Sequence, residues 1–168
     1  NVLNVQCYGD STGFIEIELD LETGKFDIIE YVAVADCGTV LHPMGLSNQV
    51  KGGTVMGLGM ACSERHIYDS QSGLPANVGF YQAKPMSYLD VPSTMQWGAV
   101  NIADPQNPVG ARGVGEPVQG CASAAILCAI SDALGGYYFN RAPITPDMIV
   151  NAAAGRSQSH LPLAVNTA

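Results

Sequence analysis

The first third of the chain alternates apolar and acidic positions. Within residues 15–21 every odd position is Ile or Leu and every even position is Glu or Asp. This two-residue period predicts a β-strand with one face in water. Residues 22–25 contain the glycine of a turn, and residues 26–35 resume with β-branched and aromatic side chains. The pattern therefore predicts a β-hairpin.

Two shorter segments also have the composition of strands. The alternation returns over residues 95–102, which predicts a third strand, and residues 65–70 predict a short strand that ends in a turn. Residues 77–92 have little periodicity and predict a long loop. Loops of this length in compact domains are usually functional or interfacial.

A glycine-rich helix is predicted after the hairpin, with Ser47 or Asn48 as its N-cap. Four positions near one face are Val50, Thr54, Gly57 and Ala61. The four glycines at 52, 53, 57 and 59 would each cost an isolated helix about 1 kcal/mol relative to Ala. That cost is tolerable if the glycines admit a ligand or another backbone, and tight packing between elements explains them at least as well.

A second helix is predicted with Glu116 at its N-cap or in its first turn and with Gly135 as its C-terminal cap. Pro117 suits its first position, where no N–H donor is needed. Its apolar stripe consists of Leu127, Ile130, Ala133 and Leu134. Because small residues dominate the remainder, we expect this helix to be buried on more than one face. Thr145 and Pro146 predict the start of a further helix.

The predicted strands and helices indicate an α+β fold, and the composition indicates a single unit that contacts other proteins. The 168 residues contain neither an internal repeat nor a shift in composition, so we treat 1–168 as a single segment. Only 13% of the residues are charged, which predicts that some faces meet other protein chains. The net charge of −8 disfavours nucleic acid and anionic membranes as partners.

The sequence also bears on location. No apolar run is long enough to span a bilayer, so no membrane span is expected. The N-terminus lacks a basic region followed by an apolar core. A cytoplasmic location is the default expectation, and a periplasmic one is left open.

Cysteine and histidine give little sign of protein-held metal. The five cysteines include no Cys-x-x-Cys pair, and Cys121 and Cys128 lie in an apolar segment, where buried reduced thiols are expected. The three histidines are scattered without a helical pair. Neither a Gly-x-Ser-x-Gly elbow nor a phosphate-binding Gly-Lys-Ser/Thr loop is present. Any chemistry would therefore depend on a cofactor.

Glu116 follows a glycine-rich loop, and two roles are open to it. An acid at a helix N-terminus offsets the partial positive charge there, worth about 0.3–1 kcal/mol. Alternatively, Gly110, Gly113 and Gly115 let a ligand approach the backbone, and Glu116 acts as a base. The residues taken alone lean toward the capping role.

The motif "GARGVGEP" stands directly before a small-residue helix. This arrangement resembles the C-terminal signature of the molybdenum hydroxylases, the xanthine oxidase and aldehyde oxidoreductase family. The preceding segment resembles the family's order of a D-x-x-T-G-K turn, D-x-G, Asn/His-Pro, and Q-x-x-G-G-x-x-x-G-x-G. Gln49 and Glu116 are 67 positions apart, as expected for this family. The resemblance covers nearly all of residues 10–150.

The resemblance implies roles for particular residues. Glu116 corresponds to the essential glutamate beside molybdenum, and it would act as the catalytic base. Gln49 corresponds to a glutamine near the pterin, and Gly113, Val114 and Gly115 would line the same site. At Met56, many relatives carry a second glutamine, so that position contributes nothing polar here.

The cofactor implied is a molybdenum–pterin dinucleotide, expected in its cytosine form. The pterin dithiolene holds the metal, which explains why the protein needs no cluster of metal ligands. The implied reaction hydroxylates an electron-poor C–H of a small molecule, namely an N-heterocycle, a purine or an aldehyde, with water as the oxygen source.

The same family has molybdenum subunits several times longer than this chain. The resemblance therefore implies a C-terminal segment that docks on a larger molybdopterin-binding chain. An iron–sulfur subunit and a flavin (FAD) or haem-containing cytochrome subunit would complete the complex. Two other hypotheses stay open: a non-catalytic structural subunit of such a complex, and a thiol-dependent hydrolase, which would need a cysteine of low pKa.

Overall fold

The computed structural model describes residues 10–160, which form an α+β fold. The strands are β1 (Asp10–Leu19), β2 (Phe26–Asp36) and β3 (Thr94–Ala99). The helices are α1 (Pro43–Cys62), α2 (Phe80–Ala83), the 3-10 helix η1 (Tyr88–Asp90), α3 (Gly115–Ala133) and α4 (Pro146–Ala153). The α+β prediction is thus confirmed for this part of the chain.

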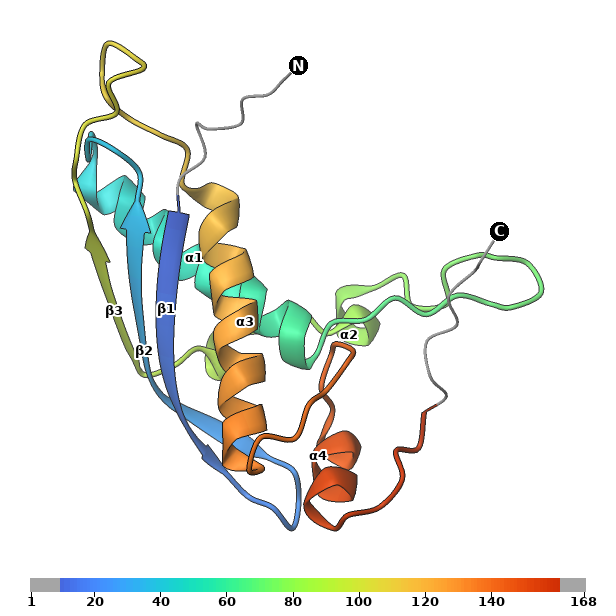
Figure 1. Ribbon diagram of the computed structural model, residues 1–168. Coiled ribbons are helices and arrows are strands. Elements are labelled where there is room, and N and C mark those ends of the chain that lie inside the picture. The colour runs from blue at the N-terminus through green and yellow to red at the C-terminus, as the bar shows by residue number, and fades with distance from the viewer. Residues whose placement is uncertain (1–9, 161–168) are drawn as a thin grey trace, which may run out of the picture.

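The three strands form one sheet in the order β1-β2-β3 (Figure 1). The predicted hairpin is confirmed, because β1 and β2 pair in antiparallel register from Asp10 opposite Asp36 to Leu19 opposite Phe26. The third strand is confirmed as β3, which pairs with β2 in parallel over Glu30–Ala35. Helices α1 and α3 lie against the same face of this sheet (Figure 1).

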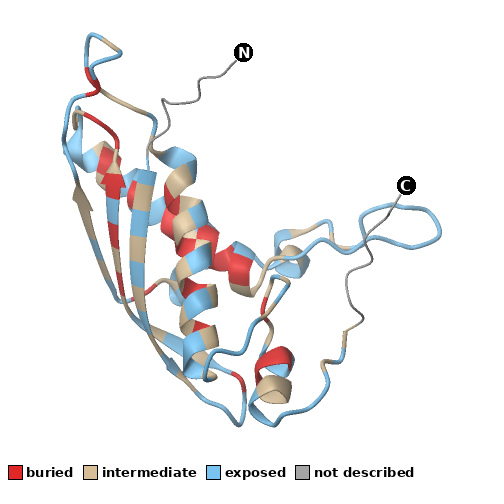
Figure 2. Ribbon diagram, in the orientation of Figure 1, coloured by how far each residue is buried: buried red, intermediate tan, exposed pale blue. Residues whose placement is uncertain are grey.

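Two neighbouring clusters of buried side chains make up the core, and Figure 2 shows most of them where α1, α3 and β2 face one another. The cluster nearer the start of α3 consists of Tyr31, Ala33, Ala35, Cys37, Leu46, Val50, Val118 and Ala122. The other consists of Leu58, Ala61, Ile126, Ile130, Ile144, Met148 and Ile149, which ties α4 to the helix pair. The apolar face of each element thus meets another element rather than water.

The glycines of α1 serve close packing against α3. The predicted face is confirmed, since Val50, Thr54, Gly57 and Ala61 are all buried. A Cβ at Gly57 would clash with the carbonyl oxygen of Gln119 and lie 2.9 Å from the Cβ of Ala122. Gly52, by contrast, has no heavy atom within 4 Å of such a Cβ. Helix packing explains Gly57, while Gly52 lies on the open side of α1.

The predicted start of α1 was wrong by several residues, whereas Glu116 is confirmed in the first turn of α3. Helix α1 begins at Pro43, because the Nδ1 atom of His42 accepts a 2.7 Å hydrogen bond from the N–H of Gly45 and so caps the helix. Helix α3 begins at Gly115, which makes Pro117 its third residue rather than its first. Pro is tolerated there because first-turn N–H groups have no partner within the helix. Thr145 is confirmed as the residue before α4.

The strand predicted over residues 65–70 was wrong. Only a single bridge joins Tyr68 to Pro75, and every residue from 65 to 70 is exposed, so no sheet surface covers this segment. The side chain of Asp69 instead organises a turn by accepting hydrogen bonds from Gln71 and Ser72. The long loop over 77–92 is mostly irregular, but it contains α2 and η1.

Burial along α3 also differs from the prediction. The buried positions are Val118, Ala122, Ile126 and Ile130, while Ala133 is exposed. The opposite stripe consists of Glu116, Gly120, Ala124, Cys128 and Asp132 and is exposed. Within the described residues α3 therefore contacts both α1 and β1, and this one stripe remains exposed. Cys128 is an exposed thiol, not a buried one.

The contact between α1 and α3 can be tested with two substitutions in α1. We expect Gly57→Ala to lower the free energy of unfolding by about 1–3 kcal/mol, because the added methyl group meets backbone that cannot rotate away. The matched control Gly52→Ala should be neutral or raise it by up to about 1 kcal/mol through helix propensity. Urea unfolding measures both, and equal effects would contradict this account of Gly57.

Candidate functional site

Glu116 lies in the first turn of α3, at the end of the glycine-rich loop. The N-cap residue is Val114, which supplies no side-chain acceptor to the first N–H groups of the helix. These donors and the positive end of the helix dipole favour a negatively charged or hydrogen-bond-accepting group nearby. The Glu116 side chain is exposed and has no hydrogen-bond or ion-pair partner among residues 10–160. Its carboxylate is therefore open to a ligand.

Gln49 reaches the same place from α1. A Cβ at Gly115 would lie 3.8 Å from the Oε1 atom of Gln49, so the two segments meet although they are far apart in sequence. Gln49 and Val114 both line a cavity of about 190 Å³ between the start of α1 and the end of the loop. Its other walls include Cys37, His42 and Arg112.

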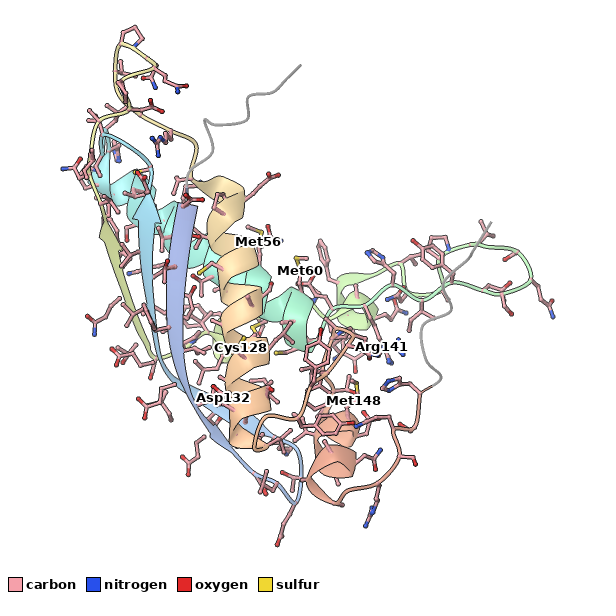
Figure 3. All side chains as sticks on the ribbon, in the orientation of Figure 1. Met56, Met60, Cys128, Asp132, Arg141 and Met148 are labelled. Carbon is pink, nitrogen blue, oxygen red and sulfur yellow. The ribbon has the colours of Figure 1, made fainter. Side chains whose placement is uncertain are left out.

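The structure thus brings Gln49, Val114 and Gly115 together. Gly113 and Glu116, which precede and follow Val114 and Gly115 in the sequence, are exposed. No heavy atom lies within 4 Å of a Cβ built on Gly113, so this glycine borders open space. Met56 lies nearly two turns beyond Gln49 on α1, toward Met60 (Figure 3). Its side chain is half exposed. Met56 is not part of this cavity.

The loop before Glu116 is held by Arg112. The Nη1 atom of Arg112 donates to Oδ2 of Asp36 at 2.8 Å, and its Nε atom donates to Oδ2 of Asp104 at 2.9 Å. The Arg112 backbone N–H also donates to the carbonyl of Cys37 at 2.6 Å. One guanidinium therefore joins the end of β2 to both ends of the loop.

Backbone hydrogen bonds also restrain this loop, both within it and to the residues after β2. The carbonyl of Gly110 accepts from the N–H groups of Thr39 and Asp104, both at 2.8 Å. The backbone N–H of Gln106 donates to Asp104, and with Arg112 it lowers the pKa of this nearly buried carboxyl group. Asp104 is thus held as a charged anchor beneath the loop.

Sequence reasoning missed this arrangement of Arg112, Asp36 and Asp104. The available signal was the occurrence of charged residues inside a Gly- and Pro-rich loop of a chain with few charges. Sequence spacing gives no indication that Asp36, 76 positions before Arg112, meets it. Only the pairing of the loop with the end of β2 brings them together.

Two of the thiols, those of Cys37 and Cys62, do not resemble activated nucleophiles. Burial raises the pKa of Cys62 to about 12 and also raises the pKa of Cys37, the cysteine that lines the cavity. A catalytic cysteine needs the opposite shift. The thiol-dependent hydrolase therefore loses support at both positions.

Two kinds of feature are absent between residues 10 and 160. No three or more His, Cys, Asp or Glu side chains gather as a potential metal site. No helix in this range combines the length and the apolar character needed to cross a bilayer.

A polar, planar cofactor matches the donor set at this place. The amide of Gln49 can donate and accept hydrogen bonds, and the first N–H groups of α3 have no side-chain acceptor. Gly113 and Gly115 leave the surface without side chains, so a flat ring system can approach the backbone. The residues present therefore fit a pterin whose own sulfur atoms hold the metal.

Comparisons with known proteins agree with this chemistry. Residues 4–92, more than half of the chain, match the model of the molybdopterin cofactor-binding domain. The chain is 31% identical over 157 residues to the gamma subunit of the 6-hydroxypseudooxynicotine dehydrogenase complex of Paenarthrobacter nicotinovorans, covering 93% of this chain and 20% of that relative. It is 33% identical over 133 residues to a putative xanthine dehydrogenase molybdenum-binding subunit of Escherichia coli, covering 79% and 17%.

Solved structures give the same result. Quinoline 2-oxidoreductase of Pseudomonas putida 86 matches with a TM-score of 0.76 and 30% identity over 84% of this chain and 18% of that one. The chain belongs to the molybdopterin-binding family of molybdenum hydroxylases that includes xanthine dehydrogenase and aldehyde oxidoreductase. It spans about a fifth of the length of the curated relatives it matches.

The Arg112 contacts predict a dependence of stability on pH. Because the folded state lowers the pKa of Asp104, this carboxylate stabilises the fold above its ordinary pKa of about 3.9, and that contribution is lost as pH falls through the lower folded value. Arg112→Met should reduce stability at neutral pH and flatten its fall below about pH 4. Urea unfolding from pH 2.5 to 7 measures this.

A matched control is Arg156→Met, which removes an exposed arginine beyond α4. Its acid profile should follow that of the unmodified protein. If Arg112→Met has the same profile as well, the arginine does not hold Asp104 in solution.

Proposed function

We propose that the chain is a catalytic segment, the C-terminal part of the molybdopterin-binding subunit of a molybdenum hydroxylase. The enzyme would hydroxylate an electron-poor C–H of an N-heterocycle, purine or aldehyde, with water as the oxygen source. One observation carries the proposal: Gln49 and the loop before Glu116 meet at the uncapped start of α3, in a chain of the molybdopterin-binding family.

The cofactor in this proposal is a molybdenum–pterin dinucleotide, expected in its cytosine form. When bound, it supplies the metal centre for the two-electron oxidation. The side chain of Gln49 would hydrogen-bond the pterin, and Val114 and the backbone of Gly113 and Gly115 would form the adjoining wall. This role suits their positions, since Gln49, Val114 and Gly115 cluster at the cavity and Gly113 borders open space.

Glu116 would act as the general base. Its carboxylate needs to be within hydrogen-bond reach of the proton that it removes. It is exposed, without a partner among the described side chains, and next in the chain to the glycine that meets Gln49. A purely structural acid would need only the helix terminus, whereas this one also adjoins the candidate cofactor surface.

Arg112 would position this base without touching the substrate. Its ion pairs to Asp36 and Asp104 restrain the backbone that leads into α3. A restrained loop keeps a catalytic carboxylate within the small tolerance that proton transfer requires. The non-catalytic alternative explains an acid at a helix terminus, but it gives no reason for the restrained loop that places this acid beside the candidate cofactor surface.

The assembled enzyme would contain further parts. The chain covers a fifth of its relatives' length, and one relative is named as a subunit of a dehydrogenase complex. We propose a larger molybdopterin-binding chain, an iron–sulfur subunit and a flavin or cytochrome subunit as partners, with a cytoplasmic location by default.

Replacing the proposed base is the direct test. In the assembled enzyme, Glu116→Gln should lower kcat by about 10²–10⁴-fold, because the amide keeps the shape but cannot take the proton. Molybdenum and pterin content should be unchanged. The control Asp132→Asn alters another exposed acid of α3 and should leave turnover within about twofold. Unchanged turnover of Glu116→Gln would leave only the structural role.

Gln49 gives a separate prediction about cofactor retention. Gln49→Ala removes a hydrogen-bonding group worth about 0.5–1.5 kcal/mol. The assembled enzyme should therefore lose molybdenum more readily during dialysis, measured by elemental analysis, with activity per remaining molybdenum largely kept. The neighbouring exposed residue provides the control Asn48→Ala. Equal retention in both variants would exclude Gln49 from cofactor binding.

A further inference from the structure

The most exposed large apolar side chains of residues 10–160 gather on one short segment. Six such side chains are more than 80% exposed, and five of them lie within residues 78–89, here called the aromatic segment. They are Val78, Phe80, Tyr81, Tyr88 and Leu89. The segment includes α2 and the start of η1, beyond the end of α1 (Figure 1). Contiguous exposure of this kind marks an interaction surface.

The backbone of the aromatic segment is nevertheless ordered by its own hydrogen bonds. The side chain of Gln82 accepts from the N–H of Gly79 at 3.0 Å, and Asp90 accepts from the N–H and hydroxyl of Ser87 at 2.8 and 2.6 Å. The hydroxyl of Ser63 donates to the carbonyl of Lys84 at 2.8 Å, which fastens the segment to the end of α1. The aromatic side chains are thus presented outward from a formed backbone, which lowers the entropy lost on binding.

The chemistry of the segment fits a protein partner. Lys84 is its only charged residue, and the Nζ atom lies 4.3 Å from the centre of the Tyr81 ring. Aromatic side chains with few charges are typical of the centre of a protein interface. An anionic membrane is disfavoured by the net charge of −8.

The comparisons indicate which polypeptide could be the partner of the aromatic segment. The aromatic segment lies inside residues 4–92, the part that matches the molybdopterin cofactor-binding domain. About four-fifths of each full-length relative lies outside the portion that this chain matches. A large amount of polypeptide of the same subunit is therefore available to cover the segment.

We propose that the aromatic segment is the docking surface for the rest of the molybdopterin-binding subunit, with Phe80, Tyr81 and Leu89 as its buried anchors. This rests on the proposed function, because it takes that subunit as the partner. On docking, the nearly complete exposure of these side chains is lost, and they supply the hydrophobic centre of the contact.

Photo-cross-linking in the assembled enzyme tests the proposal. Tyr81→p-benzoylphenylalanine keeps an aromatic side chain at a position that is 84% exposed, so the fold should tolerate it. Irradiation should join position 81 to a peptide of the molybdopterin-binding subunit that lies outside the 168 residues of this chain. Mass spectrometry identifies the cross-linked peptide. Tyr138→p-benzoylphenylalanine is the control, since Tyr138 is 83% exposed but lies outside the aromatic segment, and its yield should be several-fold lower.

Cross-linking to a second copy of this chain, to lipid or to nothing would overturn the proposal, as would equal yields from positions 81 and 138. The outcome is separable from that of Glu116→Gln. Full turnover of Glu116→Gln together with the expected cross-link would reject the catalytic role and keep the docking surface. Loss of turnover without the cross-link would do the reverse.

Discussion

The close approach of α1 to α3 at Gly57 is the constraint on which the site depends. Without a side chain there, the backbone of α1 comes within contact distance of the Gln119 carbonyl. The same approach, one and two turns earlier on α1, sets Gly53 against Val118 and the side chain of Gln49 against Gly115. A wider helix spacing would separate the two segments that form the candidate site. The glycines that weaken α1 as an isolated helix therefore allow the two segments of the candidate site to lie together.

The loop before α3 needs a second restraint, because helix packing fixes only the residues from Gly115 onward. Arg112 provides it by bridging Asp36 and Asp104, so the loop is tied to the sheet while α3 is tied to α1. Charged pairs near a surface contribute little to stability when isolated. Here the pairing of one guanidinium with two carboxylates fixes geometry more than it adds free energy.

The hairpin, β3 and the face of α1 could be predicted from the sequence, because their periodicity reflects burial against a single neighbouring layer. The start of α1 could not, since His42 is an uncommon cap whose ring nitrogen replaces a Ser or Asp oxygen. The proximity of Gln49 to Gly115 followed from the resemblance alone, because local pattern says nothing of which helices meet. The contact of Arg112 with Asp36 was missed for the same reason: it joins the loop before α3 to the end of β2, 76 positions earlier.

The exposed stripe of α3 is informative, because α3 was expected to be buried on more than one face and contacts α1 and β1 but leaves this stripe open. The small residues Gly120 and Ala124 suggested a close neighbour on this stripe, yet both are exposed within the described residues. Small residues on an uncovered helix face permit another backbone to approach closely, as Gly57 does on α1. The small residues in the exposed stripe of α3 and the apolar side chains of the aromatic segment are both better suited to contact with protein than to exposure to water. Few charges and such surfaces suit the larger assembly proposed for a chain that matches a fifth of its relatives' length.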